Sequence, residues 1–208
     1  MNPSPRSRPE APLRLRGLVL AGGRSRRMGT DKANLPHPEG KPLARRTFDL
    51  LASAGCRSVS LSLRPGQARP DGFSQHDPIP VVRDAEPDGA GPIGGLLAAL
   101  RGDPEALWLV AACDLPRLEA ATLESLLSSW TPDDVVLAFR SSSDGLPEPL
   151  CALYAPNSLR WLESAWAEGC RCPRKILIRN GCRLLDPVDD RALDNANTPE
   201  DWLSCLTP

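Results

Sequence analysis

The stretch Gly17-Leu18-Val19-Leu20-Ala21-Gly22-Gly23, near the start of a chain of 208 residues, decides the fold. Its apolar part, 17–21, is short and bounded by glycines, which is typical of a strand buried inside a sheet. The run Leu-Trp-Leu-Val-Ala-Ala at 107–112 is more apolar still and belongs at the centre of the same sheet. Both strands are followed at once by residues with unusual chemistry, so their loops are the first places to look for a site.

Strand and helix patterns alternate along the rest of the chain. Strands are expected at 17–21, 58–63, 80–82, 107–112, 134–139 and 150–154, and helices at 42–54, 92–100, 119–130, 157–167 and 199–206. This alternation predicts a single Rossmann-like three-layer α/β domain with a mainly parallel sheet and helices on both faces. Such sheets bind ligands in the crevice outside the carboxyl ends of their strands. The loops after Ala21, Val82 and Ala112 therefore carry the site.

The composition excludes several classes of function. Hydrophobic residues make up 41% of the chain and charged residues 25%, the profile of a soluble globular protein. No apolar run approaches the ~20 residues of a membrane span, so no membrane contact is expected. The formal net charge is −1, and nucleic acid is therefore not an expected partner.

The amino terminus and the cysteines bear on the cellular compartment of the protein. Residues 1–15 are rich in proline and arginine and lack the apolar stretch of a secretory signal, so we interpret them as a disordered tail before one domain at 16–208. The chain has seven cysteines, an odd number, and the close pair Cys170 and Cys172 does not have zinc-knuckle spacing. Inert thiols in a reducing cytoplasm are the expected state.

The loop after the first strand has the features of a phosphate site. It reads Gly22-Gly23-Arg24-Ser25-Arg26-Arg27-Met28-Gly29-Thr30-Asp31-Lys32. Two adjacent glycines let the backbone turn sharply and present its N–H groups to an anion. Arg27 and Lys32 bring side-chain cations to the same place. The pattern is neither a Walker A loop nor the dinucleotide fingerprint, and a solvated basic turn is the alternative interpretation.

Two further loops carry candidate ligands. In the first, which follows Val82-Arg83-Asp84, the segment 88–96 contains Gly94 and Gly95 and would let a flat ring or a ribose lie against the backbone; close packing of helix on sheet is the alternative. In the second, Cys113-Asp114-Leu115-Pro116, an acid follows the central strand directly. Asp114 is either a turn cap or an oxygen ligand for Mg²⁺.

Taken together, these segments resemble the nucleotidyltransferases that make molybdopterin dinucleotides, specifically the molybdenum cofactor guanylyltransferase family. The family's first motif is Leu-Ala-Gly-Gly, a serine, Arg-Met-Gly and Asp-Lys, and every element of it is present between residues 20 and 32. The segments Gly-Pro-Ile-Gly-Gly at 91–95, Cys-Asp-Leu-Pro at 113–116 and Asn-Ala-Asn-Thr-Pro-Glu-Asp at 195–201 follow in the expected order. The resemblance runs from residue 17 to about 206.

The resemblance implies a reaction: transfer of GMP from GTP to the phosphate of molybdopterin, with release of pyrophosphate and with Mg²⁺ as cofactor. It implies catalytic roles for Arg27, Lys32 and Asp114, with Asp114 as the metal ligand. Besides Lys32 and Asp114, the implied nucleotide-binding residues are Leu20, Ala21, Gly22, Gly23, Asp84, Gly94 and Gly95. The implied acceptor-binding residues are Glu148, Arg174, Lys175, Asn195 and Asn197. Transient contact with proteins that deliver or receive the cofactor is also expected.

The departures from the family pattern lie in the acceptor half. Many relatives have His-Pro before the strand at 150–154, where this chain has Glu148-Pro149. Three alternatives stay open: a cytidylyltransferase for the same cofactor, transfer to another phosphorylated acceptor such as a sugar phosphate, and a catalytically silent nucleotide-binding accessory. Leu-Ala-Gly-Gly at 20–23, rather than Leu-Ala-Ala-Gly, favours guanine over cytosine.

Overall fold

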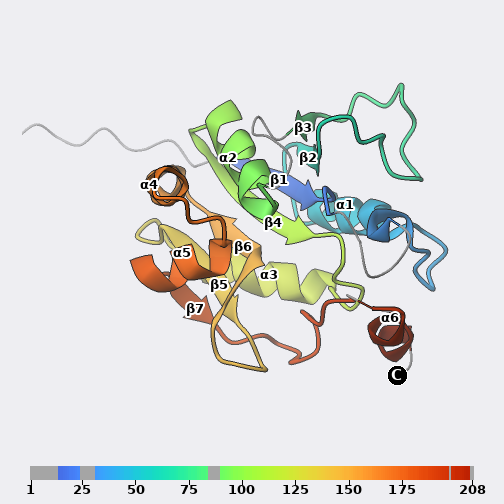
Figure 1. Ribbon diagram of the computed structural model, residues 1–208. Coiled ribbons are helices and arrows are strands. Elements are labelled where there is room, and N and C mark those ends of the chain that lie inside the picture. Colours follow the sequence, from blue (N-terminus) through green and yellow to red (C-terminus); the bar gives the residue numbers. More distant parts are fainter. Residues whose placement is uncertain (1–13, 24–30, 84–89, 197, 207–208) are drawn as a thin grey trace, which may run out of the picture.

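A computed structural model describes residues 14–23, 31–83, 90–196 and 198–206 (Figure 1). Its centre is a seven-stranded sheet in the order β3-β2-β1-β4-β6-β5-β7. The strands are β1 (Arg14–Leu20), β2 (Val59–Leu63), β3 (Val81–Arg83), β4 (Ala106–Ala112), β5 (Val136–Arg140), β6 (Pro147–Tyr154) and β7 (Arg183–Leu185). Only β6 runs antiparallel to its neighbours β4 and β5, while every other pair is parallel. The predicted α/β fold with a mainly parallel sheet is confirmed.

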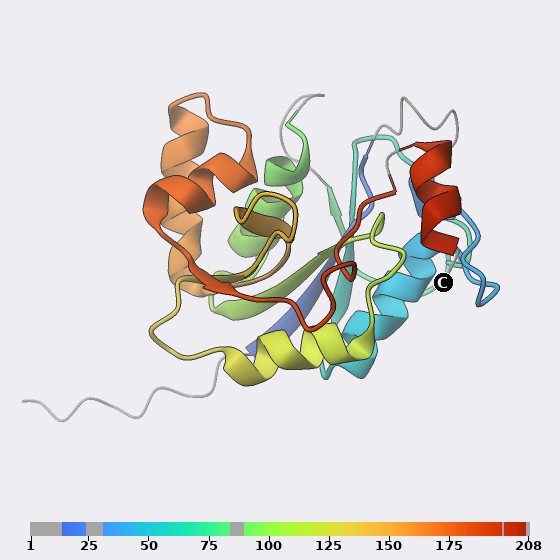
Figure 2. The ribbon, with the colours of Figure 1, turned by 90° about the horizontal axis from the view of Figure 1, so that it is seen from below.

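Helices cover both faces of the sheet. They are α1 (Leu43–Ser53), α2 (Pro92–Gly102), α3 (Ala120–Ser129), α4 (Leu159–Ala167), α5 (Pro173–Asn180) and α6 (Pro199–Leu206), with short 3₁₀ helices η1 (Lys32–Asn34) and η2 (Pro156–Ser158). Figure 2 shows α1 and α3 on one face and α2, α4 and α5 on the other. No helix in the described part of the chain is long and apolar enough to cross a membrane.

Burial on both faces explains the apolar strands. Along β1, Val19 belongs to the core cluster beneath α1 and α3, whereas Leu18 and Leu20 belong to the cluster beneath α2 and α4. All seven residues of β4 are buried. A strand covered on both faces needs apolar residues at every position, because successive side chains point to opposite faces. That requirement makes these two strands easy to recognise from the sequence.

Four elements differ most clearly from the prediction. Strand β1 begins at Arg14 rather than Gly17, because Arg14 and Arg16 pair with Asp103 at the entry to β4. Strand β6 begins at Pro147 rather than residue 150, with a register shift opposite β5. Helix α5 and strand β7 were not predicted at all; both are short, and α5 is followed by Gly181 in the left-handed conformation with φ of 72°.

Candidate active site at the carboxyl ends of β1 and β4

The candidate site lies where the strand order changes direction. From β1 the chain passes through α1 to β2 on one side, and it later returns through α2 to β4 on the other side of β1. In open sheets the connections diverge at such a point, and ligands usually bind in the crevice at the carboxyl ends of the two strands. Gly22 and Gly23 follow β1, and Asp114 follows β4. A hydrogen bond of 3.2 Å from Cys113 N to Leu20 O joins the two strand ends.

Lys32 and Asp114 meet in this crevice. Nζ of Lys32 lies 3.0 Å from Oδ2 of Asp114, and their side chains are only 14% and 23% exposed. The two residues are far apart in the sequence, so the fold itself brings the predicted cation and the predicted carboxylate together. A partly buried pair of this kind can separate to serve a ligand, the ammonium taking an anion and the carboxylate a metal ion.

Gln67 joins the two described ends of the glycine loop, and no sequence pattern had marked it. Its Nε2 donates to Ala21 O at 3.0 Å and to Asp31 Oδ2 at 3.1 Å. The other oxygen of Asp31 accepts from Ala33 N at 3.1 Å and caps η1, the short helix that carries Lys32. One amide thus ties the start of the loop to its end. Glutamine in a surface loop carries no sequence signal, because its partners are set only by the tertiary fold.

His37 joins the segment after η1 to the loop of Asp114. Its Nδ1 accepts from Glu39 N at 3.2 Å, so the proton of the neutral ring is on Nε2, which lies 3.2 Å from Pro116 O and donates to it. Burial, together with the nearby Arg46, lowers the pKa of His37. The neutral ring is a structural link, and no sequence pattern had marked it.

Packing against the sheet explains one of the glycines of α2. Helix α2 begins after Gly91, whose φ of 65° favours glycine. A Cβ added at Gly95 would lie 2.2 Å from Ser62 Oγ and 3.1 Å from Leu20 Cδ2. Gly94 and Gly95 are both buried. The packing interpretation of Gly95 therefore holds in the structure, and nucleotide contact at Gly94 and Gly95 stays a prediction.

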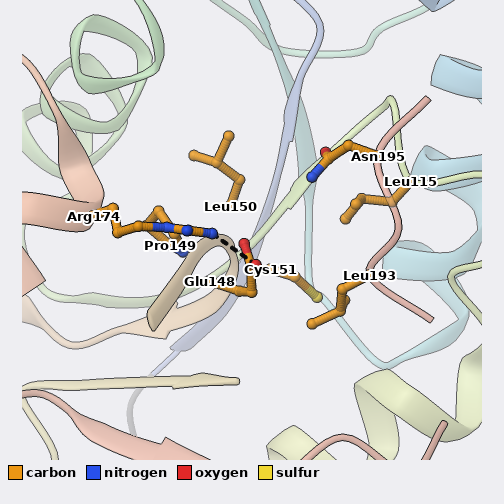
Figure 3. A pocket seen from close by; sticks show the side chains of 8 residues that line it. All are labelled: Leu115, Glu148, Pro149, Leu150, Cys151, Arg174, Leu193 and Asn195. Carbon is orange, nitrogen blue, oxygen red and sulfur yellow. Dashed lines mark hydrogen bonds and ion pairs between the residues drawn. The ribbon is translucent and has the colours of Figure 1, made fainter. Parts of the chain in front are cut away.

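A second set of predicted residues gathers beyond Asp114. A cavity of about 150 Å³ is lined by Glu148, Arg174 and Asn195 together with Leu115, Pro149, Leu150, Cys151 and Leu193 (Figure 3). Nη2 of Arg174 lies 2.7 Å from Oε1 of Glu148. Ala196 N donates to the backbone oxygen of Asp114 at 3.0 Å, which holds the segment of Asn195 close to the loop of Asp114. Lys175 is exposed and does not line this cavity.

The remaining predicted residues, Arg27, Asp84 and Asn197, lie outside the described residues. Within the described ranges no group of three or more His, Cys, Asp or Glu side chains could hold a metal ion. A single carboxylate nevertheless suits Mg²⁺, which proteins usually hold through one or two carboxylates plus substrate phosphates and water. The ammonium of Lys32 at 3.0 Å shows that Oδ2 of Asp114 accommodates a cation. The residues present fit the metal.

Comparisons with known proteins agree with this arrangement. The molybdenum cofactor biosynthesis bifunctional protein of Synechocystis is 37% identical over 188 residues, 90% of this chain but 52% of that protein, so the chain spans about half its length. The molybdenum cofactor guanylyltransferase of Pseudomonas putida is 32% identical over 88% of this chain and 93% of its own. Molybdopterin-guanine dinucleotide biosynthesis protein A of Archaeoglobus fulgidus has a TM-score of 0.71 at 27% identity, covering 91% of this chain and 96% of that one.

A family model described as the MobA-like NTP transferase domain matches residues 17–183. This match contains the whole crevice, from the glycine loop to Asp114, and also Glu148 and Arg174. The predicted family is confirmed: the chain belongs to the MobA-like NTP transferase domain family.

Proposed function

We propose that this protein is a cytoplasmic nucleotidyltransferase that moves GMP from GTP to the phosphate of molybdopterin, with Mg²⁺ as cofactor. The observation that carries the proposal is the Lys32–Asp114 pair in the crevice between β1 and β4. The relatives named guanylyltransferases align with nearly the whole described domain, which supports GTP and a molybdopterin-type acceptor as substrates.

The crevice suits phosphoryl chemistry that needs positioning rather than covalent catalysis. The phosphate of the acceptor is already an anion near neutral pH, so one of its oxygens can attack the α-phosphorus of GTP, and pyrophosphate leaves. In this proposal the backbone of Gly22 and Gly23 cradles the phosphates, and Lys32 leaves Asp114 to pair with them. Asp114 would hold Mg²⁺, which supplies positive charge where negative charge develops.

No protein nucleophile is required. The thiol nearest the crevice, Cys113, is buried, and its burial raises the pKa far above the ordinary value. It is therefore protonated at neutral pH and a poor nucleophile. This supports direct transfer between the two substrates, with Arg27 as a further cation for the triphosphate and Asp84 with Gly94 and Gly95 on the base and ribose side.

The acceptor enters from the other side of Asp114 in this proposal. Leu115, the next residue, already lines the cavity that contains Glu148, Arg174 and Asn195. An acceptor seated there would have its phosphate end near the metal carboxylate. Lys175 and Asn197 complete the proposed acceptor set.

The test is to incubate the purified protein with Mg²⁺, molybdopterin and GTP, CTP or ATP in turn, and to identify the product by mass. GTP should give the GMP adduct and pyrophosphate, and a chelator should stop the reaction. A CMP adduct formed equally well or better would make the protein a cytidylyltransferase instead. If only another phosphorylated acceptor is modified, the nucleotide assignment stands and the acceptor assignment is wrong.

A further inference from the structure

The cavity beside Asp114 opens into a larger polar hollow in which carboxylates outnumber arginines. This hollow shares Glu148, Arg174, Leu193 and Asn195 with the cavity, so the two are continuous. Of the described residues, two arginines line it, Arg140 and Arg174, against four carboxylates, those of Glu148, Asp190, Asp194 and Asp201. The formal charge of these lining groups is therefore negative.

Both arginines are already bonded to carboxylates. Arg140 Nε lies 2.8 Å from Asp186 Oδ1. Arg174 donates through Nη1 to Asp144 Oδ2 at 2.8 Å and through Nη2 to Glu148 Oε1 at 2.7 Å. A phosphate placed here would meet a surplus of negative charge and would have to break an existing ion pair. The hollow is therefore unsuited to binding a phosphate, and its carboxylates favour a ligand that donates hydrogen bonds.

Glu148 is the acceptor group best placed for such a ligand. Its side chain is 15% exposed, and Arg174 binds only its Oε1. Among the described residues, no protein group donates to its Oε2. Figure 3 shows the carboxylate between Leu150, Cys151 and Leu193, inside the ring of residues that line the cavity. A carboxylate has about four acceptor positions, so this one can still take two hydrogen bonds from a ligand.

The walls and the size of the cavity limit the class of ligand further. Leu115, Leu150 and Leu193 supply apolar surface on which a flat ring can lie. The cavity itself, of about 150 Å³, holds one small ring system, so the rest of a larger ligand would lie outside it.

We propose that Glu148 binds the hydrogen-bond-donating edge of the acceptor's bicyclic ring, a ring N–H next to an exocyclic amino group. The inference rests on the proposed function, in which the acceptor is a pterin with a phosphate at its other end. The ring then lies at Glu148 and the phosphate at Asp114, the two ends of one site. Glu148, which stands where many relatives have a histidine, thereby becomes a determinant of acceptor specificity.

Direct binding of two pteridines without any phosphate tests the proposal. The probes are 2-amino-4-oxopteridine, which has the donor edge, and 2,4-dioxopteridine, in which a carbonyl replaces the amino group; both are followed by fluorescence. The wild-type protein should prefer the amino compound by about tenfold or more, because the dioxo compound keeps the ring N–H but has a carbonyl facing the carboxylate in place of one charge-assisted hydrogen bond. Glu148→Gln should lose that preference, since an amide offers a donor as well as an acceptor.

The matched control is Glu163→Gln. Glu163 is also paired with an arginine, with Arg101 Nε 3.1 Å from its Oε1, but it lies on the surface and lines neither cavity nor hollow. It should behave as the wild type does. GTP affinity and the thermal melt of Glu148→Gln should match the wild type, which shows that the variant is folded.

Several outcomes would overturn the inference. They are failure of the wild type to bind the amino compound, equal binding of both pteridines, and an unchanged preference in Glu148→Gln. Guanine has the same donor edge, so displacement of the pteridine by GTP would also overturn it, because the cavity would then be the base site. If the pteridine results hold but no GMP is transferred, the proposed function fails while the ring site stands. If GMP is transferred without any pteridine preference, only the ring site fails.

Discussion

The two halves of the sheet differ in the charged side chains that they carry. In the parallel half, β3-β2-β1-β4, the strand ends converge on one lysine and one aspartate 3.0 Å apart. In the half built around antiparallel β6, Arg174 is shared between Asp144 and Glu148, and carboxylates are in excess. Under the proposed function, the first half would offer a cation and a metal ligand to phosphates, and the second would offer hydrogen-bond acceptors to a neutral ring. The division of charge matches a two-substrate reaction in which one substrate carries the triphosphate.

The halves also differ in how firmly their local sequence specifies them. Gly22, Gly23 and Asp114 follow strands buried on both faces, so their positions are fixed by the core of the sheet. Glu148 lies near the start of β6, opposite a register shift in β5, and its partner Arg174 comes from the short α5. Substitutions in the first half should therefore affect rate strongly, and those in the second should affect acceptor choice or stability.

The largest expected effect is that of Asp114→Asn. The amide keeps the size and the turn but is a poor ligand for Mg²⁺, so turnover should fall at least about a hundredfold. The melting temperature should change little. Asp49→Asn is the matched control, because Asp49 also pairs with a lysine, Lys41 at 2.7 Å, but lies on α1 away from the crevice. Near-normal turnover of Asp114→Asn at saturating Mg²⁺ would remove the metal site from the mechanism.

A smaller loss is expected from Lys32→Ala. Without the ammonium the triphosphate is held less well, so kcat/KM for GTP should fall by about ten- to a hundredfold. Lys41→Ala should leave kcat/KM unchanged. In the double variant with Asp114→Asn the losses should be less than multiplicative, because both residues act on the same developing charge. Fully multiplicative losses would mean that the pair in the crevice does not act as a unit.

The parallel half could be predicted from the sequence almost completely, and the reason is physical. Strands such as β4 are apolar at every position, and the glycine loop and Asp114 follow them directly, so local pattern and tertiary role coincide. Lys32 and Asp114 were predicted separately, and the topology brings them together. Gln67 and His37 were missed because their partners, Ala21 O and Pro116 O, are backbone atoms that only the fold brings near.

The other half was less predictable because its elements are short. Strand β7 has three residues with a charged one among them, and α5 has eight, too few for a clear periodic pattern. The salt bridge between Arg174 and Glu148 joins two residues of the acceptor set that the family resemblance implies. The second carboxylate on Arg174, from Asp144, has no signal in the sequence, so the excess of negative charge in the hollow could not be foreseen.

Gly95→Ala separates packing from nucleotide binding in the parallel half. The new Cβ would lie 2.2 Å from Ser62 Oγ, and overpacking of this kind costs about 1–3 kcal/mol, measured by urea unfolding. Gly102→Ala in the same helix is the control: nothing lies within 4 Å of its Cβ, and it should stabilise by up to about 1 kcal/mol. Normal stability with lost GTP affinity in Gly95→Ala would show that Gly95 serves the nucleotide instead.

The smallest effect is expected at Asp134, which holds the far edge of the sheet. Arg183 of β7 donates through Nε to Asp134 Oδ1 at 2.6 Å and through Nη2 to Oδ2 at 2.7 Å, and the side chain of Asp134 is 6% exposed. Asp134→Asn should cost about 1–2 kcal/mol at neutral pH, as expected for a bidentate charge-assisted pair with one exposed partner. Asp186→Asn, which breaks the pair of Asp186 with Arg140 at 81% exposure, should cost much less.

The pH dependence of the unfolding free energy tests whether the charge of Asp134 causes this stabilisation. Hydrogen bonds from Arg183, followed by those from Thr131, hold the pKa of Asp134 below its ordinary value of 3.8. Because the unfolded chain takes up the proton first, the stabilisation is fully present above that value and is lost as the pH falls through the lower pKa of the folded state. The difference in unfolding free energy between wild type and Asp134→Asn should therefore be constant at neutral pH and shrink in acid. A difference that persists unchanged below both pKa values would mean that β7 is held by shape and hydrogen bonding, and that the ion pair adds nothing to this edge of the sheet.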